Sequence, residues 1–449
     1  MKCGFCKKVI TPPLGTPLIG YYRERLAKGV WDDLYVRAVA FESDGVKAVI
    51  VELDICLETE DVCDLWRKTV AEFCNMDENA VFISCNHTHT GPLTTADFAS
   101  DKVADPHYMD FLEKTIRDAA FFAFEDVKPA RFFVADNQAK GISFVRRYRM
   151  KDGSVRTNPG IGNPDILEQL GKPDDQVHVL RFDRESAETL VLMHFGSHPD
   201  TVGGCKFSAD WPGFARRILE QAIPGTKAIF FNGAEGEVGV QNVRPVSGDM
   251  NGLALDFDDV YRGYESTENL GRCVAGAVMQ IYGRVEYVDV ERIACARRTI
   301  RVPANVPTLG ELPLAREYAA LHEAGQDEKI PYTGMQLTTV VAEALRMVRL
   351  ADGPEYFEMD LSGVAIGPVA FVGVPGEPFA GVSFGLEEAP GWGTVFTVCN
   401  ANGKEGYFPM QDAYDEGGYE ARSSAFKAGV AELIIEEGKA LLRTLGEQA

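Results

Sequence analysis

The stretch Ala80-Val81-Phe82-Ile83-Ser84-Cys85-Asn86-His87-Thr88-His89-Thr90-Gly91-Pro92 joins an apolar run to two closely spaced histidines. Residues 81–85 are apolar and β-favouring, which predicts a buried strand. Because side chains in a strand alternate between its faces, we expect His87 and His89 to point the same way as the strand ends. Gly91 and Pro92 then place the pair at a strand-to-loop junction. This geometry suggests a metal site, although on the spacing alone two solvated histidines on a surface strand are the better interpretation.

Strand-like and helix-like segments alternate on both sides of this stretch. Apolar periodicity predicts strands over residues 34–41, 46–53, 81–85, 130–136, 177–183, 189–195, 227–231, 364–374 and 394–400. It predicts helices over residues 58–73, 108–124, 213–222, 378–386 and 423–445, with two more around Ile330-Pro331. Such alternation indicates an α/β fold with β-sheets flanked by helices. Since no repeat or linker divides the chain, we expect one domain over residues 1–449, with a helical insertion around 309–350.

The charge balance restricts the partners. With 45 basic and 67 acidic side chains, the net charge of −22 opposes binding to nucleic acid or to anionic membranes. The N-terminus has no apolar signal core, and no stretch approaches the about 20 apolar residues that span a bilayer, so we expect a cytoplasmic protein without a stable membrane anchor. Cys3-x-x-Cys6 lacks a second such pair to complete a four-thiolate zinc site, and an ordinary N-terminal strand is the better interpretation.

A second histidine-bearing junction follows the strand predicted over residues 189–195. His198 is held extended by Pro199. His194 lies on the same face of the strand but inside it, which is typical of a residue that packs or that supports a ligand. The other histidines that lie in polar contexts are expected to be solvated: His107, His178 and His322.

Two further segments carry candidate ligands. The apolar run up to Val374 breaks at Pro375-Gly376 and places Glu377 where a helix is expected to begin. A helix N-terminus favours a negative charge, so an ordinary first-turn glutamate is, for this residue alone, the better interpretation than a metal ligand. Residues 406–421 form a glycine-rich, acidic loop with three tyrosines, which by themselves would be expected to anchor packing.

Taken together, these motifs resemble the neutral/alkaline (non-lysosomal) ceramidase family, zinc-dependent amidases. The family's His-Thr-His-Ser-Gly-Pro motif stands here as residues 87–92, with Thr90 in place of the serine. Its Ala-Val-His-Pro-Thr segment and the following Ser-Ala-Asp are similar to residues 196–200 and 208–210. Its Gly-Glu-Phe-Thr turn is similar to residues 376–379, and its tyrosine loop to residues 407–421. The resemblance covers most of the chain from Gly20 and corresponds to the catalytic domain only.

The resemblance implies mixed β-sheets flanked by helices and a Zn²⁺ cofactor. It implies four zinc ligands: His87, His198, Glu377 and Tyr407. It also implies that the residues acting on the substrate are His89, Tyr419 and Arg146, with Arg147 an almost equal candidate for the arginine.

The chain departs from the family at several points. The family's Gly-Asp-Val-Ser-Pro segment stands here as residues 236–240 with Gly239 at the serine position, which excludes a serine nucleophile there. We expect neither the family's C-terminal immunoglobulin-like domain nor a secretion signal. The expected substrate is therefore a small-molecule or lipid-like amide, smaller or more soluble than ceramide.

The proposed ligands are chemically consistent with this reading. Two imidazoles, a carboxylate and a phenol offer nitrogen and oxygen donors, and a catalytic zinc keeps one position open for water. Zinc lowers the pKa of that water to around 7 and polarises a carbonyl, which gives hydroxide attack on an amide at neutral pH. Asp54, at the end of the strand over residues 46–53, either orients a ligand histidine or is an ordinary strand-end aspartate.

Competing functions remain open at this point. A zinc hydrolase of an ester or lactone uses the same chemistry, and a non-catalytic metal- or ligand-binding homologue keeps the ligands without turnover. A serine hydrolase is suggested by Gly381-x-Ser383-x-Gly385, but that fold needs a histidine after the nucleophile, and the last histidine is His322.

Overall fold

A nine-stranded sheet forms the largest layer of the protein, in a computed structural model that describes residues 1–22, 24–96, 102–246, 260–290 and 292–448. Its path runs through eight strands: β16 (Thr226–Asn232), β14 (Thr189–Phe195), β13 (Gln176–Arg184), β8 (Lys128–Gln138), β1 (Lys2–Val9), β5 (Tyr35–Ser43), β6 (Val46–Leu53) and β7 (Val81–Cys85). The ninth strand, β18 (Glu286–Val288), pairs with β8. Two pairs, β14 with β16 and β6 with β7, are parallel, so the sheet is mixed.

A second sheet packs face to face against the first. It contains four strands in the order β19 (Ile293–Pro303), β20 (Tyr356–Ile366), β21 (Val369–Gly373) and β23 (Thr394–Val398). Buried aromatic side chains from both sheets meet between them, including Phe231 against Phe371 with ring centroids 5.3 Å apart. The alternation along β6 explains the layering, because Ile50 faces the second sheet while Val49 and Val51 face helices.

Helices cover both outer faces of this sandwich. On the large sheet lie α1 (Glu60–Cys74), α2 (Pro106–Glu125), α3 (Asp210–Ala222) and α4 (Val260–Ile281). On the second sheet lie α7 (Ala380–Glu387) and α10 (Val430–Gln448). The predicted fold, mixed β-sheets flanked by helices, is confirmed. Among the helices of the described residues, none combines the length and apolarity needed to cross a bilayer.

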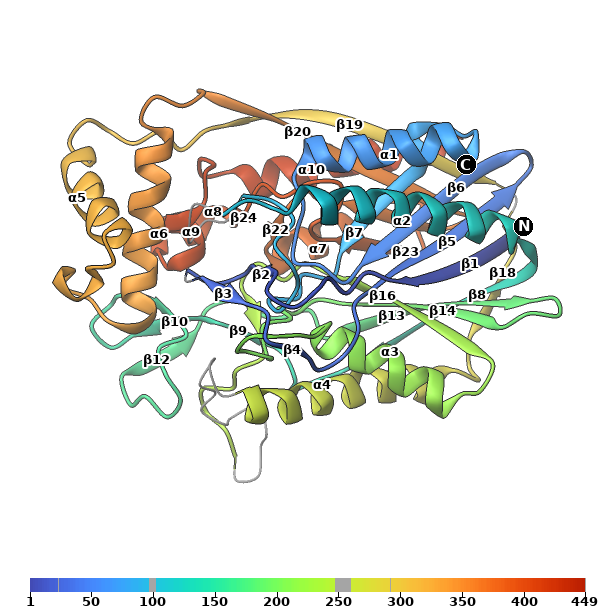
Figure 1. Ribbon diagram of the computed structural model, residues 1–449, viewed down its shortest axis with the longest axis horizontal. Coiled ribbons are helices and arrows are strands. Elements are labelled where there is room, and N and C mark those ends of the chain that lie inside the picture. Colours follow the sequence, from blue (N-terminus) through green and yellow to red (C-terminus); the bar gives the residue numbers. More distant parts are fainter. Residues whose placement is uncertain (23, 97–101, 247–259, 291, 449) are drawn as a thin grey trace.

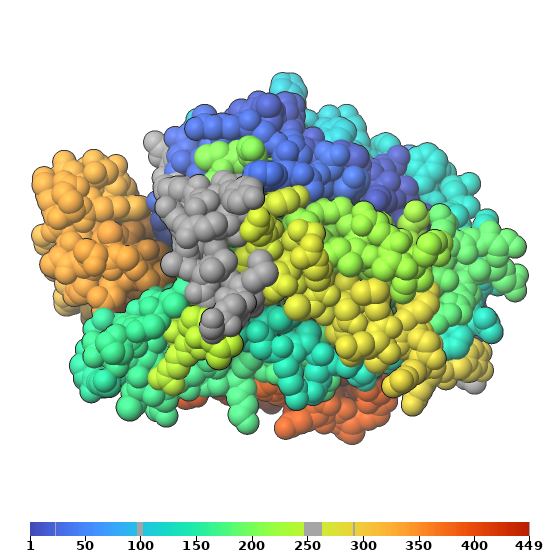
Figure 2. Space-filling view, turned by 90° about the horizontal axis from the view of Figure 1, so that it is seen from below, coloured from blue at the N-terminus to red at the C-terminus, as the bar shows by residue number. Residues whose placement is uncertain are grey.

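A pair of helices stands at one end of the molecule. Figure 1 shows α5 (Leu312–Glu323) and α6 (Gly334–Leu350) at the end opposite the two chain termini. In the space-filling view they form a lobe beside the remaining layers (Figure 2). The two helices expected around Ile330-Pro331 are therefore present. That they form an insertion into a single domain over residues 1–449 stays a prediction.

Several short elements lie between the sandwich and this helical pair (Figure 1). They pair as β2 (Pro17–Leu18) with β3 (Arg25–Leu26), β4 (Gly29–Val30) with β15 (Lys206–Phe207), β9 (Phe144–Val145) with β17 (Val238–Gly239), and β22 (Glu377–Pro378) with β24 (Tyr407–Phe408). A three-stranded sheet of β10 (Arg147–Met150), β11 (Val155–Thr157) and β12 (Ile166–Gln169) lies alongside, followed later in the chain by α8 (Gln411–Glu416) and α9 (Tyr419–Ser423).

Several boundaries differ from the sequence prediction, and the largest differences lie in the C-terminal half. The strand expected over residues 364–374 is a hairpin, because Gly367 adopts a φ of +57° and turns the chain between β20 and β21. The helix expected from residue 378 begins at Ala380, and the terminal helix expected from residue 423 begins at Val430. The long strand β19 was not predicted.

Candidate active site

The two histidines that follow β7 do not continue the strand. His87 adopts a left-handed backbone conformation with a φ of 70°, and its amide donates to the carbonyl oxygen of Ile55 at 3.1 Å. The alternation expected from a strand is thus the wrong reason for their convergence. The rings still meet, with Nε2 of His87 lying 3.2 Å from Nε2 of His89.

The opposite ring nitrogen of His87 is already engaged. Nδ1 lies 2.9 Å from the carbonyl oxygen of Cys56 and 3.1 Å from Nδ2 of Asn400. Metal-bound histidines usually donate their second nitrogen to a carbonyl or carboxylate in this way. His87 therefore presents Nε2 to the centre of the site.

His198 is oriented in the same way, through contacts of its second ring nitrogen with backbone carbonyl oxygens. It lies after β14, and its Nδ1 is 3.0 Å from the carbonyl oxygen of Glu235 and 3.1 Å from that of Val238. Its Nε2 lies 3.1 Å from Oε2 of Glu377, which is also 3.6 Å from Nε2 of His87. Donor atoms of these three buried residues all lie within 4.8 Å of one another.

Glu377 reaches this point on a strand. It belongs to β22, where it pairs in parallel register with Tyr407 of β24, and the helix begins three residues later. The interpretation as a first-turn glutamate is therefore wrong. Burial raises the pKa of Glu377, but His87 and His198 outweigh burial and lower it to about 2, so the carboxylate stays ionised.

The three side chains fit a metal ion. Nε2 of His198 and Oε2 of Glu377 are buried, and neither has a hydrogen-bond partner among the described residues. Unsatisfied buried polar atoms are costly, and a cation between them removes that cost. Cys56, His87 and His89 form a second cluster. It is the weaker candidate, because Nδ1 of His87, on the side of Cys56, already bonds a carbonyl.

Arg146 contacts the tyrosine that lies beside this centre. Its Nη2 donates to the hydroxyl of Tyr407 at 3.1 Å, and its Nε donates to Oε1 of Glu420 at 2.6 Å. Arg147 instead donates to Glu416 at 2.9 Å, away from Tyr407. Of the two arginines left open by the sequence, the geometry thus brings Arg146 to the site.

His89 and Tyr419 line a cavity of about 500 Å³ together with His87, Glu377 and Tyr407. The hydroxyl of Tyr419 lies 3.2 Å from that of Tyr22. Behind His89 stands Gly20 with a φ of +113°, where a Cβ atom would come within 2.8 Å of the imidazole. Burial, reinforced by His87 and His198, holds the pKa of His89 well below its usual range.

Of three comparisons with known proteins, only the search of solved structures finds a match. No family model matches the sequence, and no curated protein matches it. A solved neutral ceramidase from Pseudomonas aeruginosa superposes on 99% of this chain and 75% of its own, with a TM-score of 0.73 and 20% identity. The chain has the fold of a neutral ceramidase. A ceramidase complexed with C2 matches at a TM-score of 0.71 and 18% identity, again over 99% of this chain and 75% of that one.

On this neutral-ceramidase fold, the position of the absent serine is close to the site. Gly239 pairs with Phe144, and a Cβ atom built on it would lie 3.8 Å from Cδ of Arg146. That distance is an ordinary contact, so the backbone itself has room for a side chain there. A residue with a side chain at position 239 is thus compatible with the surrounding backbone.

Asp54 does not contact a histidine among the described residues. It accepts hydrogen bonds from Arg37 at 3.1 Å and from Nδ2 of Asn86 at 2.7 Å, and it pairs with Arg216. Its role as a direct partner of a ligand histidine is wrong, because two buried guanidinium groups occupy its carboxylate. It reaches the site only through Asn86, which precedes His87.

Other candidates lie away from the cavity. Ser383 is buried inside α7, where its hydroxyl donates to Glu387 at 3.2 Å, so it is not an exposed nucleophile. His178, expected to be solvated, is buried and has its Nδ1 2.5 Å from Oδ1 of Asp136. His194 stacks on Phe396 and bonds the carbonyl oxygen of Thr397, so it packs within the sandwich. Cys3 belongs to β1 and is buried in the sheet.

Sequence reasoning missed several residues around the site. Glu235 lies beneath the two histidines, with Oε1 accepting from Cys399 at 3.0 Å and from Asn400 at 3.4 Å. Arg349 of α6 and Lys404 line the cavity mouth. Glu235 stands three residues after the end of strand β16, as His198 does after β14, and this shared sheet edge was the available signal. The two basic residues carry no local signal.

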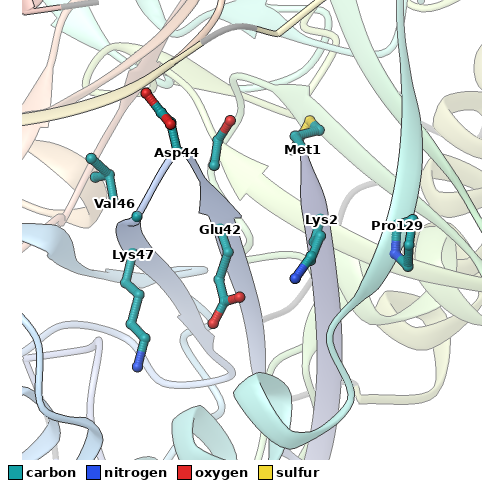
Figure 3. Close-up of a pocket in the computed structure, with 9 residues that line it drawn as sticks. Met1, Lys2, Glu42, Asp44, Val46, Lys47 and Pro129 are labelled. Carbon is teal, nitrogen blue, oxygen red and sulfur yellow. The ribbon is translucent and has the colours of Figure 1, made fainter.

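A second hollow, of about 410 Å³, lies by the β5–β6 turn and is shown in Figure 3. Its charged lining residues are Lys2, Glu42, Asp44 and Lys47. Among the described residues that line it there is no histidine or cysteine. The chemistry therefore concentrates in the cavity beside His87.

Proposed function

We propose that this protein is a zinc-dependent hydrolase that cleaves the carbon–nitrogen bond of an acylated amine smaller or more soluble than ceramide. The observation that carries the proposal is the buried trio of His87, His198 and Glu377, whose donor atoms converge within 4.8 Å. The similarity of the fold to solved ceramidases supports an amide as the reacting group.

Zinc held by these residues would lower the pKa of a water molecule and polarise the scissile carbonyl. Tyr407 is proposed as the fourth ligand. Its ring lies nearly parallel to that of His198, at an angle of 23° with centroids 6.4 Å apart, and its hydroxyl receives the hydrogen bond from Arg146. Arg146 thereby fixes the direction of the phenol oxygen.

The substrate-facing residues are proposed to be His89, Tyr419 and Arg146. His89 would pass a proton to the departing amine, and the position of its Nε2, 3.2 Å from Nε2 of His87, supports this role. Tyr419 and Arg146 offer O–H and N–H donors to the oxygen on which negative charge develops. Each such donor contributes about 3 kcal/mol in comparable enzymes.

The cavity favours a small substrate. About 500 Å³ is within the range of sites for small molecules. Part of its wall is apolar and is formed by Leu57, Ala342, Leu345 and Ala425. We propose that this wall receives the acyl chain.

Two measurements test the proposal. Purified protein should bind one zinc ion per chain, and His87→Ala should lose it, whereas His107→Ala, an exposed histidine on α2, should retain it. Zinc-loaded protein should hydrolyse N-octanoylethanolamine, with turnover lost after chelation and restored by added zinc. Zinc binding without turnover of any amide would overturn the amidase assignment. Cleavage of esters or lactones alone would reassign the bond, and no turnover at all would indicate a binding protein.

A further inference from the structure

The lining of the cavity carries more basic than acidic side chains although the whole chain carries a net charge of −22. Arg346 and Arg349 on α6 and Lys404 before β24 line it, and Glu405 is the acidic residue lining it outside the proposed ligand set. This local excess of positive charge opposes the overall balance. It lies in the same cavity as His87 and Glu377.

Lys404 has no partner for its charge. It is half-buried, and no hydrogen bond or ion pair of its ammonium group exists within the described residues. Burial, the largest influence, lowers its pKa, while Glu58 and Glu405 act on it only from beyond ion-pair distance. A partly buried, unpaired ammonium group costs free energy unless a ligand supplies the counter-charge.

The two arginines likewise make no ion pair with a carboxylate within the described residues. Arg346 is 6% exposed, and its guanidinium donates to the backbone carbonyl oxygens of Arg422 at 3.0 Å and Asn305 at 2.7 Å rather than to a carboxylate. The nearby carboxylate of Glu343 already binds the side chain of Arg422. Arg349 is exposed at the mouth and makes no ion pair within the described part of the chain.

We propose that Lys404 and Arg349, with Arg346 behind them, form an anion-binding subsite, and that the substrate is an acylated amine bearing a carboxylate or phosphate group. The apolar wall and the metal trio lie in the same cavity as this subsite, so the acyl chain, the amide and the anionic group fit one ligand. Water is the co-reactant: the carbon–nitrogen bond breaks, the acyl carbon gains the hydroxyl and the amine gains the proton. The choice of amide rests on the proposed function, whereas the anion subsite does not.

Matched substrates test the subsite. N-octanoylglycine, N-octanoyl-phosphoethanolamine and the neutral N-octanoylethanolamine share one acyl chain. Zinc-loaded protein is expected to show a kcat/KM at least about 10-fold higher for an anionic amide than for the neutral one, and the preferred anion identifies carboxylate or phosphate. Lys404→Met and Arg349→Met are each expected to lower this ratio about 10-fold, and Glu405→Gln to raise it. Lys172 is exposed and is not among the residues that line the cavity, so Lys172→Met serves as the matched control and should leave the ratio unchanged.

The outcomes separate the two proposals. If no amide is hydrolysed, calorimetry with N-octanoylglycine and N-octanoyl-phosphoethanolamine replaces the assay. Binding that Lys404→Met weakens at least about 10-fold then supports the subsite while the hydrolase assignment fails. A ratio near one in the unaltered protein, or a ratio that neither variant changes, overturns the subsite. Because Arg349 is exposed, its variant keeps the test valid even where the Lys404 variant misfolds.

Discussion

Nε2 of His87 lies 3.2 Å from Nε2 of His89, and the two rings stand nearly perpendicular, at 83°. The remaining nitrogens differ. Nδ1 of His87 is bonded to the carbonyl oxygen of Cys56, whereas Nδ1 of His89 is buried with no hydrogen-bond partner among the described residues. Since a ligand imidazole is normally fixed through its second nitrogen, the pair divides into one proposed ligand and one proposed substrate-facing residue.

This division predicts different results for the two histidines. His87→Ala should lose bound zinc, while His89→Gln should retain it at one ion per chain and lose at least about 100-fold in kcat, within the range that proton transfer contributes. Metal analysis after dialysis and an amide assay measure the two effects. Loss of zinc from both variants would instead place both imidazoles on the metal.

Glu235 tests whether residues that support a proposed ligand from behind affect metal binding. Its carboxylate accepts from Asn400, which in turn contacts Nδ1 of His87. Glu235→Gln should therefore weaken zinc affinity about 10- to 100-fold, as changes behind a ligand usually do. Competition with a chelator of known affinity measures this change.

The neighbouring Glu237 is the matched control. Burial raises its pKa to about 8, so the neutral amide of Glu237→Gln resembles the carboxyl group already present at pH 7. Its Oε1 accepts from the amide of Ala380 at 3.0 Å, which glutamine can preserve. Equal losses of zinc affinity in both variants would mean that Glu235 has no special role.

The ion pair of Arg146 and Glu420 predicts a stability effect separate from catalysis. Both side chains are buried and lie 2.6 Å apart. Arg146→Met leaves the Glu420 carboxylate unpaired, which should lower the free energy of unfolding by about 3–5 kcal/mol. Arg146→Met combined with Glu420→Met should recover most of that loss in urea unfolding. Activity should stay low in both, since Tyr407 loses its donor, and simple additivity of the two losses would contradict the pairing.

The sequence predicted those elements whose signal is local. The strands β7 and β14 match the predicted ranges to the residue, because each is an apolar run bounded by polar residues. The hairpin of β20 and β21 was read as one strand, because the Gly367 turn interrupts an otherwise continuous apolar run. Local periodicity does not show how two sheets stack.

In the candidate site, too, only the local features could be predicted from the sequence. The spacing of His87 and His89 is visible in the sequence, but their convergence depends on a left-handed residue that the strand pattern does not show. Glu377 reaches the site through pairing with Tyr407, and the charges of Arg349 and Lys404 meet only after α6 packs beside the cavity. Each of these contacts joins segments distant in the chain, so it has no periodic signature.

His178 predicts a pH dependence of stability that is independent of the metal. Its Nδ1 lies 2.5 Å from Oδ1 of Asp136, and its Nε2 lies 3.8 Å from Oε1 of Glu387. Burial lowers the pKa of His178, but the hydrogen bond to Asp136 and the negative charges of Asp136 and Glu387 outweigh it and raise the value to about 9. The folded protein therefore keeps a proton that the unfolded chain, with a pKa near 6.5, releases first.

The sign of the effect follows from that difference. The stabilisation is fully present below pH 6.5 and is lost as the pH rises through about 9, because the unfolded state binds fewer protons over that interval. The half-exposed Asp136 reduces the gain through solvent screening, so a loss of about 1–2 kcal/mol is expected. Unfolding free energies of the unaltered protein and of His178→Gln, measured from pH 5 to 10, should converge as the pH rises. Parallel curves would show that the His178 proton does not stabilise the fold, because a glutamine cannot titrate.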